Sequence, residues 1–261
     1  MVMVPNKFIL SLLLVFMVYA PAFADASTHD ELDYLGAFGN GGTESEPPDI
    51  KVLQHGSRSL MKVALTFDDG PFAYTGEILD VLAEHGVKAT FFLVGTQVEQ
   101  FPHVAKRIVD EGHEIGNHSY SHKHLTRVDP AVWKYEIDQC SVVIYKAIGV
   151  LPRLFRPPYD LFNEEILDYV NSAGMILVQW DVDPTDWAKP SAKKIRQRIM
   201  REVRPGAIII CHDFSKGTRL GLGSLIDALQ ENEYELVTVG EMISDLMPES
   251  QKVETSKEGV F

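Results

Sequence analysis

The chain has 261 residues, of which 45% are hydrophobic and 23% are charged, and its formal net charge is −13. This composition is ordinary for a globular protein, and the length suffices for one large domain with its own core. Such an acidic chain is a poor candidate for binding nucleic acid or anionic lipid, because both ligands are bound by basic surfaces.

The N-terminus has the pattern of a secretory signal. Lys7 is the only charged residue among residues 1–24, an apolar run covers residues 8–19, and Ala22-Phe23-Ala24 follows it. We expect cleavage after Ala24, with Ala26 as a second site, and a secreted, periplasmic or cell-envelope protein. A retained anchor is the alternative, although the run is short for a membrane span. Cleavage would leave 23 basic and 37 acidic residues, a net charge of −14.

Beyond the signal, residues 25–58 are rich in Gly, Glu, Asp, Pro and Ser and are predicted to be a flexible spacer, and residues 248–261 a frayed tail. Strand and helix patterns alternate over residues 59–247 between them. The predicted strands lie at residues 62–67, 89–93, 114–115, 175–180, 207–212 and 236–239. The predicted helices lie at residues 75–84, 102–110, 130–148, 164–173, 192–203 and 224–231.

This alternation, with strands that are apolar throughout, predicts an α/β fold in which helices cover a parallel sheet. We expect a single domain built as a distorted (β/α) barrel with mostly parallel strands, and keep a doubly wound open sheet as the alternative. In both architectures the active groups gather at the carboxyl ends of the strands. The two cysteines, Cys140 and Cys211, are too few for a disulfide framework. One bridge between them is possible, but two unpaired buried thiols are favoured.

Two adjacent carboxylates, Asp68 and Asp69, stand between an apolar run and the turn Gly70-Pro71. Side chains alternate along a strand, but a turn at its end can bring both carboxylates into one cleft. Neighbouring carboxylates repel one another unless a cation or proton compensates, which suits a metal ligand beside a general base. Ordinary turns also contain such pairs, so the motif alone leaves both interpretations open.

Downstream, His118 and His122 are four residues apart, a spacing that on a helical turn lets two imidazoles share one metal ion. With Asp69 they would form a two-histidine, one-carboxylate set that leaves positions for water and substrate. A pair of surface histidines is the alternative, but the upstream carboxylates and the downstream His212 favour the metal site. The remaining histidines are expected to be solvated or structural, namely His29, His55, His85, His103, His113 and His124.

Five motifs in order carry a resemblance to a known family. They are Thr66-Phe67-Asp68-Asp69-Gly70, His118-Ser119-Tyr120-Ser121-His122, Arg156-Pro157-Pro158-Tyr159, Asp183-Pro184-Thr185-Asp186-Trp187 and Ile210-Cys211-His212. From about Lys62 to the region of Glu241, the chain resembles the polysaccharide deacetylases, the NodB homology domain of carbohydrate esterase family four. The first two motifs are specific, whereas the last gains weight only from its place in the order.

The resemblance implies that Asp69, His118 and His122 hold a divalent metal, Zn²⁺ in the first place and Co²⁺ or Mn²⁺ as alternatives. Such a metal would acidify and position a water molecule. Asp68 would be the general base that takes the proton of this water, and Arg156 would be the partner that keeps Asp68 ionised.

The resemblance also implies roles at the other strand ends. The backbone N–H of Tyr159 would stabilise the oxyanion, and His212 would protonate the departing amine as general acid. Asp186 would orient and charge this histidine. Trp187 and Ile210 would line the cleft and bind the substrate. Each of these residues has an ordinary alternative as a turn former or core residue.

Some residues depart from the family pattern. Asp160 stands where the family usually has glycine, Ile210 replaces a common leucine, and Phe214-Ser215-Lys216 replaces a glycine-rich stretch. None of these departures affects an expected metal ligand, acid or base, so they concern the fit of the substrate.

The expected function is that of an exported, metal-dependent deacetylase that releases acetate from N-acetylated amino-sugar polymers, peptidoglycan first and chitin-type glycans second. The expected partner is therefore a polysaccharide or oligosaccharide, with no nucleic acid and no membrane span after cleavage. O-acetylated xylan, a non-sugar amide or imide, and a non-catalytic glycan-binding role are the alternatives. Loss of Asp68, a metal ligand or His212 would have indicated the last, and all are present.

Overall fold

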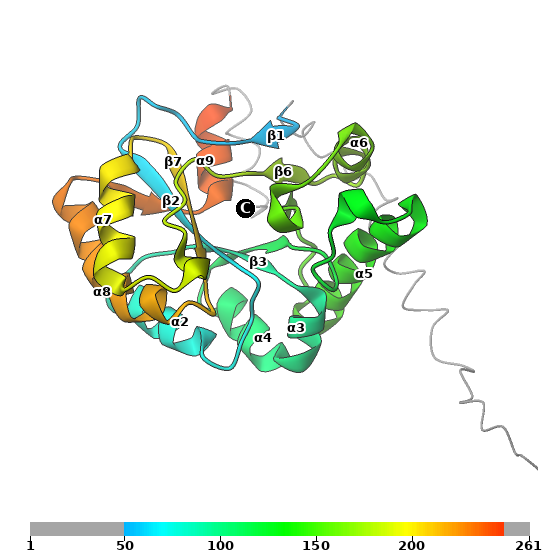
Figure 1. Ribbon diagram of the computed structural model, residues 1–261, viewed down its shortest axis with the longest axis horizontal. Coiled ribbons are helices and arrows are strands. Elements are labelled where there is room, and N and C mark those ends of the chain that lie inside the picture. Colours follow the sequence, from blue (N-terminus) through cyan, green and yellow to red (C-terminus); the bar gives the residue numbers. More distant parts are fainter. Residues whose placement is uncertain (1–49, 248–261) are drawn as a thin grey trace, which may run out of the picture. The chain divides into compact units, whose positions relative to one another are not determined.

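The computed structural model describes residues 50–247 (Figure 1). The predicted signal peptide and tail, and most of the predicted spacer, lie outside these residues. Within the described range, no helix combines the length and the apolar character that a membrane crossing requires. Both cysteines are buried and unpaired, which confirms the favoured prediction.

Strands and helices alternate along the described residues, and the helices surround the strands (Figure 1). The strands are β1 (Val52–Leu53), β2 (Lys62–Asp68), β3 (Thr90–Leu93), β4 (Glu114–Asn117), β5 (Leu154–Phe155), β6 (Ile176–Val178), β7 (Ala207–His212) and β8 (Glu235–Val237). The helices are α2 (Thr75–Glu84), α3 (Gly95–Gln100), α4 (Pro102–Asp110), α5 (Pro130–Ile148), α6 (Glu164–Ser172), α7 (Ala192–Glu202), α8 (Lys216–Glu231) and α9 (Val239–Leu246). Short 3-10 turns cover Leu125–Arg127, Pro158–Asp160 and Asp186–Ala188.

The strands form one parallel sheet in the order β1-β6-β5-β4-β3-β2-β7, with β8 paired to the first half of β2. The chain beyond β6 links the two ends of this order. Val182 forms a bridge with Ile209 of β7, and the N–H of Asp181 donates to the carbonyl of Ile208 at 3.1 Å. The predicted distorted barrel of parallel strands, rather than an open sheet, is therefore confirmed.

The pleat of β2 decides which side chains enter the barrel. Leu65 and Phe67 pack with the helices outside, where the ring of Phe67 stacks on that of Phe91 at 5.0 Å. The alternate residues Thr66 and Asp68 lie on the opposite face, as a period of two requires, and both contact the side chain of a fully buried arginine. The inner face of β2 is therefore polar at its carboxyl end, where a site can form.

The amino-terminal half of the barrel is apolar, and α9 contributes much of this core. Val239, Met242 and Ile243 of α9 pack with residues of several strands. Burying a side chain of this size contributes about 1.5–3 kcal/mol. A capping box between Thr238 and Glu241 starts the helix. The packed core leaves the opposite, carboxyl ends of the strands for polar side chains.

Several predicted elements have the observed bounds, namely the helices at residues 75–84, 102–110 and 130–148 and the strand at residues 207–212. Other elements differ. Helix α8 begins at Lys216 rather than at residue 224, because its glycines permit close packing and do not mark a loop. A Cβ on Gly221 would lie 2.8 Å from the Cβ of Ala192 on α7. Helix α3, strand β5 and helix α9 were not predicted.

The predicted boundary of the spacer at residue 58 is wrong for the described residues. Strand β1 lies within the predicted spacer and pairs with β6. The N–H of Gly56 donates to the carbonyl of Gly206 at 2.8 Å, and Arg58 forms an ion pair with Asp181 at 2.6 Å. A two-residue strand has no detectable periodicity, and only its distant partner stabilises it.

Candidate active site

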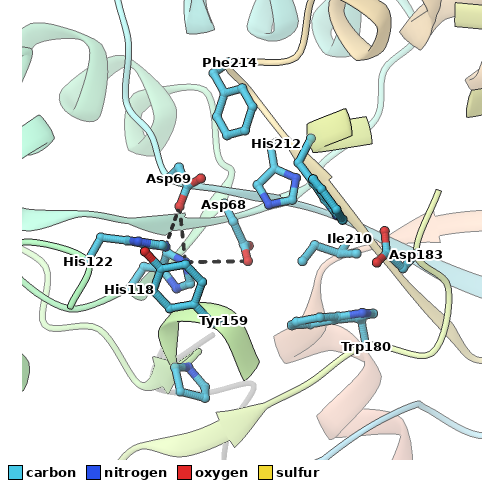
Figure 2. Close-up of a pocket in the computed structure, with 12 residues that line it drawn as sticks. Asp68, Asp69, His118, His122, Tyr159, Trp180, Asp183, Ile210, His212 and Phe214 are labelled. Carbon is cyan, nitrogen blue, oxygen red and sulfur yellow. Dashed lines mark ion pairs between the residues drawn. The ribbon is translucent and has the colours of Figure 1, made fainter. Parts of the chain in front are cut away.

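Asp68 and Asp69 end β2, and the backbone turns between them. Asp68 is the last residue of the strand and faces the barrel interior. Asp69 has a φ of 76°, a left-handed conformation that few residues other than glycine adopt. This turn directs its carboxylate towards His118 and His122, whereas Asp68 lies between that group and His212 (Figure 2). The prediction that both carboxylates enter one cleft is confirmed.

His118 and His122 follow β4 in a loop and not on a helical turn. Ser119 and His122 have φ angles of 64° and 57°, left-handed conformations that a right-handed helix does not contain. The imidazole rings nonetheless lie close together, with 5.0 Å between their centroids and 58° between their planes. The spacing therefore predicted the pairing of the rings and not the backbone that produces it.

Buried polar groups hold this loop. The carboxamide of Asn117 accepts a hydrogen bond from the N–H of Ser119 at 2.8 Å. The carboxylate of Glu136 on α5 accepts from the N–H and the hydroxyl of Ser121 at 2.6 and 2.7 Å. Glu136 also pairs with Lys123. Because these groups are inside the protein, they fix the loop that presents both histidines.

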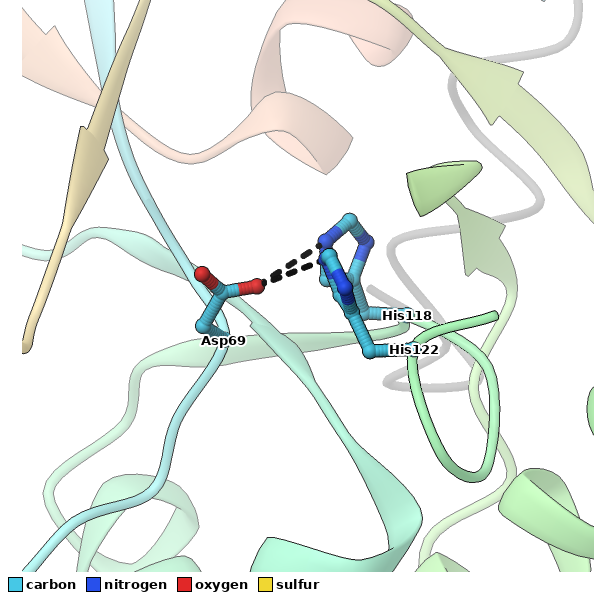
Figure 3. A group of neighbouring side chains, drawn as sticks. All are labelled: Asp69, His118 and His122. Atoms are coloured by element: carbon cyan, nitrogen blue, oxygen red, sulfur yellow. Dashed lines mark ion pairs between the residues drawn. The ribbon is translucent and has the colours of Figure 1, made fainter. Parts of the chain in front are cut away.

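Asp69, His118 and His122 have the donor set of a divalent metal site (Figure 3). Oδ1 of Asp69 lies 3.4 Å from Nε2 of His118 and 3.0 Å from Nε2 of His122. One ligand atom from each residue falls within 4.8 Å of the other two. Oδ1 of Asp69 is also buried without a hydrogen bond of good geometry among residues 50–247. A buried carboxylate oxygen that lies beside two imidazole nitrogens is an arrangement in which these three atoms could bind one cation.

The neighbouring imidazoles also control the charge of Asp69. Burial acts to raise the pKa of this carboxyl, but His118 and His122 outweigh burial and hold the pKa well below its usual range. Asp69 is thus ionised, as a ligand to a cation must be.

Arg156 crosses the inside of the barrel and anchors Asp68. The side chain is 0% exposed, and Nη1 donates to Oδ1 of Asp68 at 2.8 Å and to the hydroxyl of Thr66 at 2.7 Å. Its remaining nitrogens donate to the carbonyls of Val178 and Gln179 at 3.2 and 3.1 Å. Burial lowers the pKa of Arg156, and the charge of Asp68 opposes this shift. The pair is therefore an internal one in which each charge compensates the other.

His212 and Asp186 form a second coupled pair. Nδ1 of His212 donates to Oδ1 of Asp186 at 2.7 Å, and the N–H of His212 donates to Oδ2 at 2.9 Å. The hydroxyl of Thr218 also donates to Oδ2, at 2.5 Å. Burial acts to lower the pKa of His212, but the hydrogen bond to Asp186 and the charges of Asp186, Asp68 and Asp69 raise it to about 9. His212 is therefore protonated at neutral pH.

These side chains border one cavity of about 520 Å³. The lining includes the predicted residues Asp68, Asp69, His118, His122, Tyr159, Trp187, Ile210 and His212 (Figure 2). Arg156 and Asp186 do not line the cavity. Arg156 lies behind Asp68 and holds its carboxylate, and Asp186 lies behind His212 and holds its ring. Trp187 is 55% exposed, so its ring is accessible at the rim. The structure therefore brings together all ten residues that the sequence singled out.

The wall also contains residues that were given no role from the sequence, namely Pro157, Trp180, Asp183 and Phe214. Trp180 follows an apolar strand and could not be told from a core residue. Phe214 lies two residues after His212, so its position beyond a strand end was the available signal. Asp183 accepts a hydrogen bond from the N–H of Thr185 at 2.6 Å.

The structure shows how Asp160 occupies a position where the family usually has glycine. Asp160 and Tyr159 both have positive φ, 58° and 61°, where glycine is favoured. Asp160 is held there because its carboxylate accepts a hydrogen bond from Nε2 of Gln179 at 2.8 Å. The ring of Tyr159 stacks on His124, with 3.7 Å between the centroids, so His124 supports the wall.

Comparison with known proteins gives relatives over most of the chain. Residues 56–178 match the family model described as polysaccharide deacetylase. A peptidoglycan-N-acetylglucosamine deacetylase of Bacillus cereus is 39% identical over 186 residues, 71% of this chain and 66% of the relative. A chitooligosaccharide deacetylase of Bradyrhizobium sp. (strain ANU 289) is 40% identical over 197 residues, 69% of this chain and 89% of the relative.

Solved structures agree in fold. The Bc1960 peptidoglycan N-acetylglucosamine deacetylase, in complex with 4-naphthalen-1-yl-N-oxidanyl-benzamide, has a TM-score of 0.72 and 36% identity, over 74% of this chain and 92% of that one. BA3943 of Bacillus anthracis, described as a pseudoenzyme of the CE4 family, has a TM-score of 0.71 and 31% identity, over 76% of this chain and 70% of that one. The sequence relatives and the shared fold show that this chain belongs to the polysaccharide deacetylase family, the NodB homology domain of carbohydrate esterase family four.

Proposed function

We propose that this protein is a metal-dependent deacetylase that hydrolyses the N-acetyl groups of N-acetylglucosamine polymers and releases acetate. The observation that carries the proposal is the separation of two charged pairs in one cavity. Asp68 is paired with Arg156 on one side, His212 with Asp186 on the other, and the Asp69, His118 and His122 set adjoins Asp68.

Asp69, His118 and His122 would hold a divalent metal, with Zn²⁺ as the first choice because nitrogen and oxygen ligands in a three-residue set suit it. Bound there, the metal would lower the pKa of a water molecule and polarise the acetamide carbonyl. Asp68 is placed to accept the proton of the attacking water, because Oδ2 lies 3.8 Å from Nε2 of His118, beside the metal ligands. Arg156 pairs with this carboxylate and fixes its orientation.

His212 would give its proton to the nitrogen of the departing amine. Its raised pKa keeps the proton on the ring at neutral pH. Nδ1 donates its hydrogen bond to Asp186, so Nε2 is the nitrogen that can donate a proton to the substrate. The backbone N–H of Tyr159 is proposed as a donor to the oxyanion. Trp187 and Ile210 would bind the sugar face and the acetyl methyl group at the cavity wall.

Membership of the family does not by itself give activity, since BA3943 is described as a pseudoenzyme. Activity is proposed here because the base, acid and donor residues are all present and point into one cavity. Peptidoglycan and chitin-type oligosaccharides are proposed as substrates because the named relatives act on them. Export is proposed from the N-terminal sequence alone.

The test is acetate release from N-acetylglucosamine oligomers and purified peptidoglycan, with and without a chelator. We expect release from at least one polymer, loss of release with the chelator, and recovery on adding Zn²⁺. His118→Ala should lose activity, whereas His103→Ala, which removes an exposed histidine of α4, should behave as the parent protein. Release from neither polymer, or equal activity of His118→Ala and the parent protein, would contradict the proposal.

A further inference from the structure

A second cavity adjoins the proposed active site. It has a volume of about 420 Å³ and shares Phe214 as a wall with the active-site cavity. Its lining comes from two segments, residues 189–192 and residues 214–217, together with Leu220. The two segments begin two residues after Trp187 and two residues after His212. A polymer bound with one sugar at His212 would therefore extend past Phe214 into this second cavity, which we call the basic cavity.

The charge of the basic cavity is opposite to that of the chain as a whole. Lys189 and Lys216 line it, both are exposed, and neither has an ion-pair or hydrogen-bond partner for its ammonium group within residues 50–247. Some other lysines of the described chain are paired, such as Lys62 with Asp245, whereas Lys189 and Lys216 differ from the remaining unpaired lysines in lining a cavity beside the proposed active site. Two uncompensated cations beside the active site of a chain with a net charge of −13 are a local charge that a bound anion would complement.

The surrounding helices provide no counter-charge. Helices α7 and α8 both begin at the basic cavity, and neither has an acidic residue in its first turn. Acidic residues are the usual occupants of a first turn, because they compensate the positive end of the helix. The charge of Lys216 at the start of α8 thus remains uncompensated by its own helix.

The backbone holds both lysines in defined places. Lys189 ends the 3-10 turn that carries Trp187, and its N–H donates to the carbonyl of Asp186 at 3.0 Å. Ser215, which precedes Lys216, donates its hydroxyl to the carbonyl of Asp186 at 3.3 Å. The same aspartate orients His212, so the position of both lysines is tied to that of the proposed acid. Phe214, and Leu220 at 70% exposure, provide apolar surface for a sugar ring between them.

We propose that the basic cavity is a subsite for a carboxylate carried by the same glycan, next to the N-acetylated sugar that is hydrolysed. This inference rests on the proposed function and narrows it to acidic amino-sugar polymers over neutral ones. In peptidoglycan the carboxylate has two sources, the lactyl group of the muramic acid residue and the acidic groups of its peptide. Chitin-type oligosaccharides offer neither.

The experiment compares three soluble substrates of equal sugar number. They are a neutral N-acetylglucosamine oligomer, a muramic acid-containing fragment without peptide, and the same fragment with its peptide. The variant is Lys189→Gln with Lys216→Gln. The control is Lys51→Gln with Lys146→Gln, which removes two exposed lysines outside both cavities and changes the net charge equally.

We expect the cavity variant to lower kcat/KM on the acidic fragments by roughly three- to twentyfold, as two exposed ion pairs allow. On the neutral oligomer, its kcat/KM should change by less than about twofold, and the control should change little on any substrate. Rising salt should lower the parent activity on acidic fragments and have less effect on the cavity variant. If the cavity variant loses kcat/KM on both acidic fragments, the bound carboxylate is that of the lactyl group. If it loses kcat/KM only on the fragment with peptide, the bound carboxylate belongs to the peptide.

An equal change on neutral and acidic substrates, or no change on the acidic ones, would overturn the inference. Failure of the proposed function is seen separately, as no acetate release by the parent protein from any substrate. In that case, the subsite is tested by calorimetry, which measures the affinity of the same fragments for the metal-free parent protein and the metal-free cavity variant. Acidic fragments must then bind more weakly to the cavity variant than to the parent protein, and equal binding rejects the subsite.

Discussion

Nδ1 of His118 donates a hydrogen bond to the backbone carbonyl of Arg156 at 2.7 Å. This bond fixes the tautomer of the imidazole, so that Nε2 faces Asp69. The guanidinium of the same Arg156 holds Asp68 at 2.8 Å. One residue therefore sets the orientation of both a proposed metal ligand and the proposed base, which couples the positions of the two groups.

The two adjacent carboxylates should have different functions. We expect Asp69→Ala to lose bound metal, since it removes the atom that both histidines face. Asp68→Asn should retain the metal and lose turnover by about 10²–10⁴-fold, the usual contribution of a general base. Metal content after dialysis and acetate release by the same preparations measure both effects. Equal metal loss in the two variants would show that the division of roles is wrong.

Replacing Arg156 should affect stability. Arg156→Met leaves the carboxylate of Asp68 buried without a partner, so the free energy of unfolding should fall by about 3–5 kcal/mol. The double variant with Asp68→Asn should recover part of this loss, because the unpaired charge is also removed. Urea unfolding measures the change. Arg58→Met breaks the more exposed pair with Asp181 and should cost less than about 1 kcal/mol.

The pH dependence of activity should follow His212. The proposed acid must be protonated, and its pKa is raised to about 9, so activity should fall as the pH rises through that value. Asp186→Asn removes the charge that raises this pKa, and burial then lowers it. The alkaline limb should therefore move to lower pH, with a loss on the order of tenfold at pH 8 and a smaller loss near pH 6. An unchanged limb would exclude His212 as the acid.

The aspartate at position 183 provides a matched control for this profile. It lies in the same segment but accepts its hydrogen bond from the N–H of Thr185. Asp183→Asn should keep the alkaline limb of the parent protein, even if the affinity for the substrate changes.

Glu136 should affect metal affinity without touching the metal ligands. Glu136→Ala removes the two hydrogen bonds to Ser121 that fix the loop of His118 and His122, so the affinity for Zn²⁺ should fall by about 10- to 100-fold. Glu99→Ala is the control, because Glu99 contacts the same loop only through the hydroxyl of Tyr120 at 3.1 Å. Competition with a chelating dye measures both affinities, and equal values would reject the role of Glu136.

Long elements with strong patterns could be predicted from the sequence. The helix at residues 130–148 starts with proline and ends before Gly149, whose φ of 74° is a conformation that glycine adopts readily. Asp129 occupies the N-cap position and makes no side-chain hydrogen bond there. Short strands could not be predicted in this way, because β1 and β5 have two residues each and depend on partners far along the chain.

For the site, the sequence by itself determined which residues carry the chemistry. Their types and order carry the family resemblance, which implied the proposed metal ligands, base and acid. Only the tertiary structure decided how they act together. It turned Asp69 away from Asp68, placed the histidines in a loop held by Glu136, buried Arg156 within the barrel and brought two unpaired lysines beside the cavity. These relations join residues that are distant along the chain, and packing alone creates such contacts.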